Sequence, residues 1–388
     1  KINLLASTST KSKGIKKGLI TDVELALDSV RRAISDTEDL LGLKIKKVIA
    51  SVPSFNAEYS IIKGDIKISN EESIVTHEDI LNSLEVAVRN TQFNTREMIT
   101  ILPIDYTLDD KAFIKNPLGM KGTTLGCKAV LVSTPKKNVY SVVSLLEQLG
   151  IEVVDVMLGS IGDIYSYKTK ELESKIGAII NVGAETTTVS LYNKGIVVKN
   201  SIIGLGGKSI DNDIAYMYKI DLKEATKIKE KFALAHKKHA STSDFYEVES
   251  ATGENIKISQ YEVSEIVESR IEEILELGKK EINILTNREV EYIIITGGLS
   301  ELAGFGYLVD TQFGAMAKVC NITTMGLRHN KYSSVLGIIK YFDDKISLRG
   351  KSYNMINSEE FDNLISSQQK LVNNDNIIGK VFGHFFDS

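Results

Sequence analysis

Residues 181–188 read Asn-Val-Gly-Ala-Glu-Thr-Thr-Thr, and residues 296–304 read Thr-Gly-Gly-Leu-Ser-Glu-Leu-Ala-Gly. The first stretch lies between two runs that favour strands. A hairpin there presents backbone N–H groups beside hydroxyls, which suits phosphate oxygens, and Gly183 permits close approach because it has no Cβ. The second stretch follows an apolar strand-like run, and a strand that turns through glycine into a helix offers a helix N-terminus to a nucleotide. Both stretches therefore predict contacts to a nucleotide.

Neither stretch is specific alone. Threonine also occurs in hairpins simply because it favours strands, and many α/β proteins turn from strand to helix through glycine. Between the two stretches lie a Gly206-Gly207 turn and a largely helical segment. The order of phosphate hairpin, Gly-Gly turn, helical insertion and Thr-Gly-Gly is the layout of the second half of actin-like nucleotide-binding folds.

Apolar periodicity and turn residues divide the rest of the chain into elements. In the first half they predict a Lys/Gly turn at 11–18, a turn at 116–119, strands at 1–8, 48–52, 59–68, 98–106, 125–133 and 151–157, and helices at 23–41, 76–90, 136–148 and from 158 to about 170. In the second half they predict strands at 176–182, 187–192, 196–203 and 290–296, and helices from about 210, at 223–236 and at 261–285, the last two flanking a polar loop. Thr76 is placed to cap its helix.

Composition sets limits on the class of protein. A chain of 388 residues with 43% hydrophobic residues is long enough for two or more domains. A net charge of −4 argues against broad nucleic-acid binding. The only cysteines, Cys127 and Cys320, give no disulfide framework and favour a reducing cytosol. The sequence has no signal peptide and no apolar run of the ~18 residues that a spanning helix needs.

The end of the chain carries a helical pattern. If residues 377–388 form a helix, six apolar side chains fill one of its faces and Lys380 lies on the other. The six are Ile377, Ile378, Val381, Phe382, Phe385 and Phe386. Such a face suits the headgroup boundary of a membrane, although a terminal helix docked on its own domain gives the same pattern. The polar residues 346–376 before it indicate a flexible linker, which favours the membrane interpretation.

The sequence resembles the superfamily that contains actin and the sugar kinases, and within it the FtsA family of bacterial cell-division proteins. The resemblance covers essentially the whole chain. It is carried by Gly-Ile-Lys-Lys-Gly-Leu-Ile-Thr-Asp at 14–22, Asn-Pro-Leu-Gly-Met at 116–120, Thr-Gly-Gly at 296–298 and the tail. It implies an α/β, actin-like fold of duplicated ribonuclease-H-like halves, with an FtsA-type inserted subdomain in the first half.

The resemblance also implies a division of the chain into subdomains. These are 1A at 1–53 and 133–173, the inserted subdomain 1C at 54–132, 2A at 174–207 and 290–345, 2B at 208–289, the linker at 346–376 and the membrane-targeting helix at 377–388.

By the same resemblance, the protein binds ATP with Mg²⁺, forms polymers and binds the C-terminal peptide of FtsZ. It lies in the cytoplasm, peripherally on the inner face of the cell membrane at the division site, and later division proteins bind residues 54–132. We expect the nucleotide to contact Asn181, Gly183, Thr186, Thr187, Gly206, Gly207, Lys229, Gly297 and Gly298. Lys229 would reach the nucleoside, with a solvated lysine as the alternative. Arg270 would bind the FtsZ peptide, with intrahelical pairing to Glu273 as the alternative.

Two departures from the family pattern bear on catalysis. Comparison of the halves aligns 1–8 with the third strand at 196–203, so we expect two strands and the first phosphate loop to precede Lys1. Asn181 stands where hydrolytic members carry Asp, and a neutral amide cannot supply the charge that helps to hold magnesium and its water. The expected activity is ATP binding with weak or no hydrolysis, and no catalytic residue or metal ligand is assigned. His236 and His239 lack the companion ligands of a metal site.

Two alternatives share the fold. A type IV pilus assembly ATP-binding protein would have the same insertion but a different partner peptide. A sugar or acid kinase would need a catalytic carboxylate in the first half, where none stands out, and would have no use for a tethered membrane helix.

Overall fold

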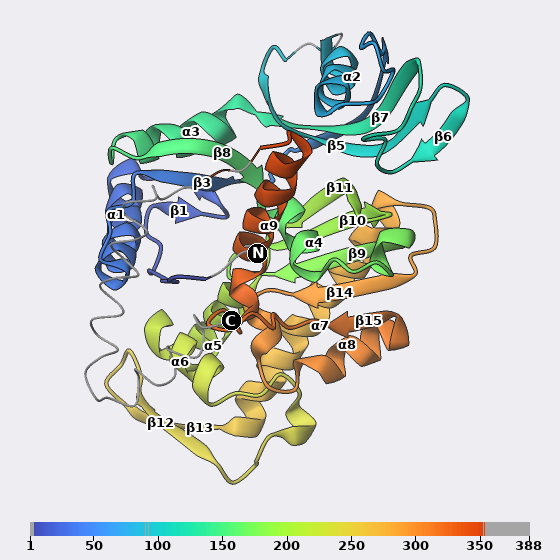
Figure 1. Cartoon of the computed structure of the whole chain (residues 1–388). Helices are drawn as coiled ribbons and strands as arrows, with labels where there is room; N and C mark the ends of the chain where they lie inside the picture. The colour runs from blue at the N-terminus through green and yellow to red at the C-terminus, as the bar shows by residue number, and fades with distance from the viewer. Residues whose placement is uncertain (1–3, 90, 92, 352, 354–388) are drawn as a thin grey trace, which may run out of the picture.

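A five-stranded sheet forms the centre of the second half of the chain (Figure 1). The computed structural model describes residues 4–89, 91, 93–351 and 353. The sheet has the order β11-β10-β9-β14-β15, in which β9–β11 are antiparallel and β14 runs parallel to β9 and β15. Its strands are β9 (Ile176–Val182), β10 (Thr187–Asn193), β11 (Ile196–Ile203), β14 (Tyr292–Thr296) and β15 (Ala317–Val319).

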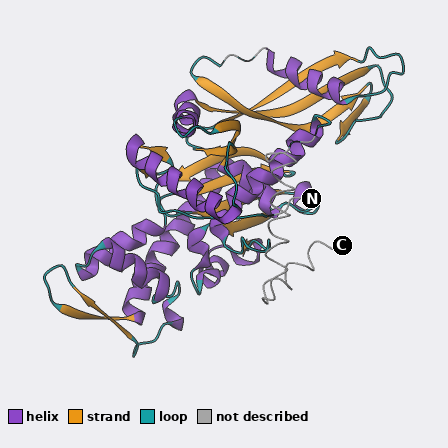
Figure 2. Cartoon of the chain, turned by 60° about the vertical axis from the view of Figure 1, so that its left-hand side comes forward, coloured by secondary structure: helices purple, strands orange, loops and turns teal. Residues whose placement is uncertain are grey.

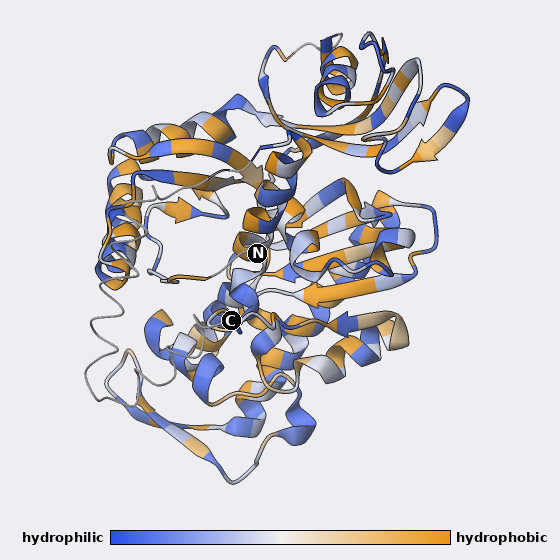
Figure 3. Cartoon of the chain, in the orientation of Figure 1, coloured by the Kyte–Doolittle hydropathy of each residue, from blue (hydrophilic) through white to orange (hydrophobic). Residues whose placement is uncertain are grey.

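Both faces of this sheet are buried. Successive side chains of a strand point to opposite faces, and in β9 Ile180 packs with the core of α7 (Gln260–Leu285), whereas Ile179 packs with that of α4 (Gly159–Tyr167). The continuous apolar run of β14 has the same cause, because all five of its residues are buried. Figure 3 shows the apolar strands inside and polar segments on the outer helices and hairpins.

The first half repeats part of this plan. β3 (Lys47–Val52) and β8 (Glu152–Leu158) form a parallel pair, as β14 and β15 do. Around them lie the short hairpin of β1 (Ile15–Lys16) and β2 (Leu19–Ile20), with α1 (Val23–Leu41) and α3 (Lys136–Glu147).

The predicted strand at 1–8 is wrong for the described residues 4–8, which have no regular structure. In the described part of the chain, no strand pairs with residues 4–8. Instead, the Thr8 hydroxyl donates to the Ala33 carbonyl of α1 and contacts the Thr37 hydroxyl.

An antiparallel sheet of order β4-β7-β5-β6 interrupts the first half. It comprises β4 (Glu58–Lys67), β5 (Arg96–Leu108), β6 (Lys111–Ile114) and β7 (Thr124–Pro135), and α2 (His77–Arg89) packs on it around a separate apolar core. Thr76 caps α2 as predicted, because its hydroxyl accepts from Asp79 N at 3.2 Å while Thr76 N donates to the Asp79 carboxylate at 2.9 Å. The sequence did not predict β6.

The helical insertion of the second half contains α5 (Gly207–Tyr218), α6 (Leu222–Lys231) and α7, followed after β14 by α8 (Phe305–Phe313). The predicted polar loop before α7 contains a hairpin, β12 (Phe245–Glu249) and β13 (Asn255–Ser259), and this prediction was therefore incomplete. The helix predicted to reach residue 236 ends at Lys231. Phe232 N and Ala233 N both donate to Ile228 O at its end, and the amides that follow bond outside the helix: Leu234 N to Ser264 Oγ and Ala235 N to Ala303 O. Figure 2 shows this hairpin and the inserted sheet at opposite ends of the molecule.

Helices α4 and α9 (Ser333–Leu348) cross at two glycines. A Cβ on Gly337 would overlap the Gly162 carbonyl oxygen, so the two backbones are in contact. Helix α4 ends at Tyr167, short of the predicted residue 170, and α9 extends to Leu348, so the linker predicted from residue 346 begins too early. The rest of that linker, from 354, and the tail 377–388 lie outside the described residues. In the described part of the chain, no helix is long and apolar enough to cross a membrane.

The crossing makes a stability prediction. We expect Gly337→Ala to destabilise the protein by about 1–3 kcal/mol, because the added methyl group forces two packed backbones apart. Gly306→Ala in α8 is the matched control, since its Cβ would meet nothing within 4 Å; it should keep or slightly raise stability. Urea unfolding followed by circular dichroism measures both. If the Gly337→Ala protein were as stable as the parent, the backbones of α4 and α9 could not be in close contact at this position.

Candidate functional site

Three glycine turns meet at one cavity in the second half. This glycine-turn cavity has a volume of about 500 Å³, and it is lined by residues from the β9–β10 turn, the start of α5, α6, the segment after β14 and the loop before α9: Gly183, Ala184, Gly207, Lys229, Glu230, Gly298, Leu299, Glu301, Leu302, His329 and Lys331. Four of the residues predicted from sequence, Gly183, Gly207, Lys229 and Gly298, therefore line one cavity.

Backbone hydrogen bonds hold the first two turns together. Gly207 N donates to Gly183 O at 2.9 Å, and Lys208 N donates to Ala184 O at 2.7 Å. A Cβ on Gly206 would overlap Ala184 and the Gly183 carbonyl, so only glycine permits this approach. The N-terminus of α5 is thereby fixed against the phosphate-type hairpin.

The third turn depends on Gly297. Its φ of 98° lies in a region that favours glycine, and a Cβ there would collide with the backbone of Val182 on the neighbouring strand. Gly298 follows with open space beside it, because the nearest atom to a Cβ there, Lys331 Cβ, would be 4.0 Å away. Gly298 therefore leaves room in the cavity.

The remaining predicted residues support the turns from behind. Thr187 is fully buried, and its hydroxyl donates to Leu205 O at 2.9 Å. The Thr186 carbonyl accepts from Gly183 N at 3.0 Å, which closes the hairpin. The Asn181 amide nitrogen lies 3.0 Å from each carboxylate oxygen of Asp163 on α4. None of these three residues lines the cavity.

Lys229 is not a solvated lysine. It is only 7% exposed, its ammonium lies 2.7 Å from Asp211 Oδ1, and it donates to Gly207 O at 3.0 Å. The lysine therefore joins α6 to α5 and brings a positive charge to the cavity wall.

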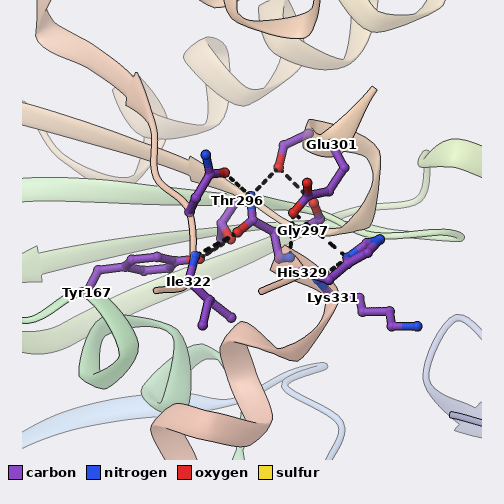
Figure 4. Close-up of polar contacts among 10 residues, drawn as sticks. Tyr167, Thr296, Gly297, Glu301, Ile322, His329 and Lys331 are labelled. Atoms are coloured by element: carbon purple, nitrogen blue, oxygen red, sulfur yellow. Dashed lines mark hydrogen bonds and ion pairs between the residues drawn. The ribbon is translucent and has the colours of Figure 1, made fainter. Parts of the chain in front are cut away.

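Sequence reasoning missed the polar residues that approach from the loop before α9. Asn330 is completely buried there; its backbone N donates to Glu301 at 2.6 Å and its amide to Ser300 Oγ at 3.1 Å. This holds His329 and Lys331 at the cavity (Figure 4). No motif marks these residues in the sequence, because a buried asparagine in a loop has no periodic signal.

A half-buried tyrosine supports the same turn from the first half. The Tyr167 hydroxyl lies 2.6 Å from Thr296 Oγ1, the residue before Gly297 (Figure 4). Burial raises the pKa of Tyr167, so the hydroxyl keeps its proton near neutral pH.

The predicted Lys/Gly turn at 11–18 contacts the hairpin instead of facing only solvent. Lys17 N donates to the Glu185 carboxylate, which also accepts from Lys208 Nζ at 2.5 Å. Partial burial disfavours the charged carboxylate, but these hydrogen bonds outweigh it and lower the pKa of Glu185. The β1–β2 turn and the β9–β10 turn are thus joined across the two halves.

Arg270 is engaged within the protein. Its guanidinium donates to both oxygens of Asp213 on α5, at 2.7 and 2.9 Å, and also bonds Glu273, the intrahelical partner considered from sequence. His236 binds the Glu268 carboxylate at 2.8 Å, and the described residues contain no cluster of three or more His, Cys, Asp or Glu that could hold a metal ion.

Comparisons with known proteins agree with this architecture. Residues 178–337 match the family described as "Cell division protein FtsA", and residues 57–133 match "SHS2 domain inserted in FTSA". The chain is 24% identical over 362 residues to the cell division protein FtsA of Bacillus subtilis, covering 92% of this chain and 82% of that one. It is 27% identical to FtsA of Borreliella burgdorferi, covering 90% of this chain and 88% of that one.

Solved structures share the fold. One titled "PilM-PilN type IV pilus biogenesis complex" has a TM-score of 0.55 at 13% identity and covers 86% of this chain and 89% of its own. MreB5 of Spiroplasma citri bound to ADP has a TM-score of 0.51 at 16% identity, covering 86% of this chain and 78% of its own. With two family matches, an actin-like sheet and the inserted sheet, the chain belongs to the FtsA family of bacterial cell-division proteins.

Proposed function

We propose that this protein binds ATP in the glycine-turn cavity and tethers FtsZ polymers to the cell membrane as a polymer itself. The observation that carries the nucleotide part is the convergence of three glycine turns on one cavity of about 500 Å³, a size suited to a small ligand. FtsZ binding, self-assembly and membrane attachment rest on membership of the family, together with the features considered below.

The cavity offers groups that suit a nucleotide. The N-terminus of α5, a helix of 12 residues, begins at Gly207 on the wall, where the helix dipole favours phosphate; the N–H groups of Gly207 and Lys208 themselves donate to the β9–β10 turn. Lys229, paired with Asp211, and Lys331 bring ammonium groups to the wall, beside the carboxylates of Glu230 and Glu301. The loops at Leu299 and Leu302 supply apolar surface for a base. This distribution of charged and apolar groups supports a nucleotide rather than an uncharged ligand.

Magnesium would arrive with the triphosphate. Asn181 supplies no charge, the buried carboxylate Asp163 accepts from three side-chain donors, and the buried carboxylate Asp211 is paired with Lys229. We therefore propose slow hydrolysis or none. Likeness to the pilus protein concerns the fold alone, and the kinase alternative has no feature of the cavity in its favour.

A substitution that fills the cavity tests the nucleotide site. Gly298→Leu should weaken binding of a fluorescent ATP analogue by about tenfold or more, which corresponds to about 1.4 kcal/mol, because the side chain enters space that the ligand needs. Gly306→Leu, at a glycine with equally open surroundings in α8, is the control and should keep the parental affinity. Equal affinities for the two variants would rule out this cavity as the ATP site.

Arg270 is the proposed contact for the acidic FtsZ peptide. It lies on α7 with 27% of its side chain exposed, and its fork already binds a carboxylate, Asp213. A peptide carboxylate would replace or share that partner, since guanidinium groups bind carboxylates through two parallel hydrogen bonds. Internal pairing lowers the net gain from such an exchange.

Two variants separate the roles of Arg270. Arg270→Ala should weaken peptide binding by about 1.5–3 kcal/mol, the usual value of a hydrogen bond to a charged group. Asp213→Asn should bind the peptide as tightly as the parent or more tightly, because it leaves the guanidinium with a weaker internal partner. Fluorescence anisotropy with a labelled FtsZ C-terminal peptide measures both. Parental affinity in a folded Arg270→Ala protein would remove Arg270 from the site.

The membrane part of the proposal rests on the sequence of residues 377–388. Burial of six apolar side chains gives at most ~1.5–3 kcal/mol each. Ordering the backbone costs roughly 1–2 kcal/mol per residue, and Lys380 adds only about 1 kcal/mol on anionic lipid. A single tail therefore holds weakly, and a polymer with many tails holds firmly through effective concentration. We propose that the inserted sheet of 54–132 binds later division proteins.

Removal of residues 377–388, or Phe382→Glu, should abolish co-sedimentation with anionic liposomes while leaving ATP and FtsZ-peptide binding intact. Asp387→Ser on the polar face is the control and should sediment as the parent does, because it leaves the apolar face unchanged. Undiminished co-sedimentation of the tail-less protein would refute membrane attachment through this segment.

A further inference from the structure

Asp163 is a fully buried carboxylate that no cation neutralises among the described residues. It lies on α4 and is 2% exposed. Asn181 Nδ2 lies 3.0 Å from both of its oxygens, and the hydroxyls of Ser333 and Ser334 donate to its Oδ1 at 2.9 and 2.7 Å. The carboxylate therefore joins α4, α9 and β9 where the helices cross.

This arrangement fixes the orientation of the Asn181 amide. A flipped amide would turn its oxygen toward two carboxylate oxygens, so the nitrogen must face Asp163. The amide oxygen then points the other way: a Cβ built on Gly297 would lie 2.5 Å from Asn181 Oδ1. The oxygen thus faces the Thr296-Gly297 turn, one residue from Gly298 of the cavity wall.

We propose that Asp163 is a positioning residue, whose carboxylate holds the Asn181 amide with its acceptor oxygen toward the nucleotide cleft. The inference rests on the proposed nucleotide site and deepens it. An acceptor fixed beside the Thr296-Gly297 turn, behind the cavity wall, would receive a hydrogen bond from a water of the nucleotide site, without carrying charge itself.

The two oxygens of Asp163 have different partners, and this makes an exchange of residues informative. Oδ1 accepts from both serines and from Asn181, whereas Oδ2 accepts from Asn181 alone among the described residues. An asparagine at 163 can keep the serine bonds through its own Oδ1 and donate from Nδ2 to an aspartate at 181. The exchanged pair, Asp163→Asn with Asn181→Asp, therefore keeps both serine bonds and one of the two bonds between residues 163 and 181, and loses the bond that Asn181 Nδ2 donates to Asp163 Oδ1.

The experiment is a double-mutant cycle with two readouts, urea unfolding and affinity for a fluorescent ATP analogue. Asn181→Asp alone should unfold at lower urea, because two buried carboxylates then face each other. Asp163→Asn alone opposes two amide donors and lets Asn181 turn, so ATP affinity should fall about tenfold. The double variant should recover part of the stability lost by Asn181→Asp, because one of the two bonds between the residues forms again.

Asp155→Asn is the matched control. Asp155 on β8 pairs with Lys345 on α9 at 2.7 Å, so the control weakens another contact of the same helix without touching Asn181; it should lower stability and leave ATP affinity unchanged. Additive stability losses in the cycle, or parental ATP affinity in Asp163→Asn, would overturn the inference. A parent protein that binds no ATP would instead overturn the proposed function.

Discussion

The close crossing of α4 and α9 governs the rest of the structure. Helix α4 leads from β8 of the first half into β9 of the second, and α9 returns from the second half toward the inserted sheet, where the Tyr341 hydroxyl contacts Thr100 at 2.5 Å. Both connections between the halves therefore pass through the point where Gly162 meets Gly337. Two glycines are needed because any side chain there would separate the backbones. The distance between the halves depends on this contact.

The site is assembled from backbone more than from side chains. Hydrogen bonds between the β9–β10 turn and the start of α5 set two walls, and the left-handed Gly297 sets the third. Groups from outside this half then support them: the Tyr167 hydroxyl contacts Thr296, and the Lys17 backbone N–H donates to Glu185. A backbone site of this kind tolerates change at many side chains, which is compatible with identities of 24–27% to relatives that share the family.

Local patterns predicted the elements well where short-range chemistry decides them. β9 and β11 begin and end where the sequence indicated, and Asp22 and Thr76 cap their helices through side-chain oxygens. The wrong predictions concern segments whose structure depends on contacts with residues far away in the sequence. Residues 4–8 have a sequence that favours a strand, but no strand pairs with them in the described chain. Helix α6 ends before residue 236 because Leu234 N bonds Ser264 of α7 and Ala235 N bonds Ala303.

The candidate site shows the same division. Gly183, Gly207 and Gly298 could be found because a glycine turn after a strand has a recognisable pattern, and all three line one cavity. His329, Lys331 and Asp163 could not, because their places depend on how α9 and α4 pack on the second half. The structure also shows contacts that the sequence did not predict for two residues already identified. Lys229 forms an ion pair that links two helices, and Arg270 already binds a carboxylate.

Hydrogen–deuterium exchange with and without ATP and Mg²⁺ tests the central claim most directly, because it locates the nucleotide without any substitution. The account predicts slower exchange in the turns at 183–187, 206–209 and 297–301, which surround the glycine-turn cavity. Unchanged exchange in those turns would contradict it. So would protection confined to the separate cavity of about 410 Å³ between β5, α4 and the β10–β11 turn.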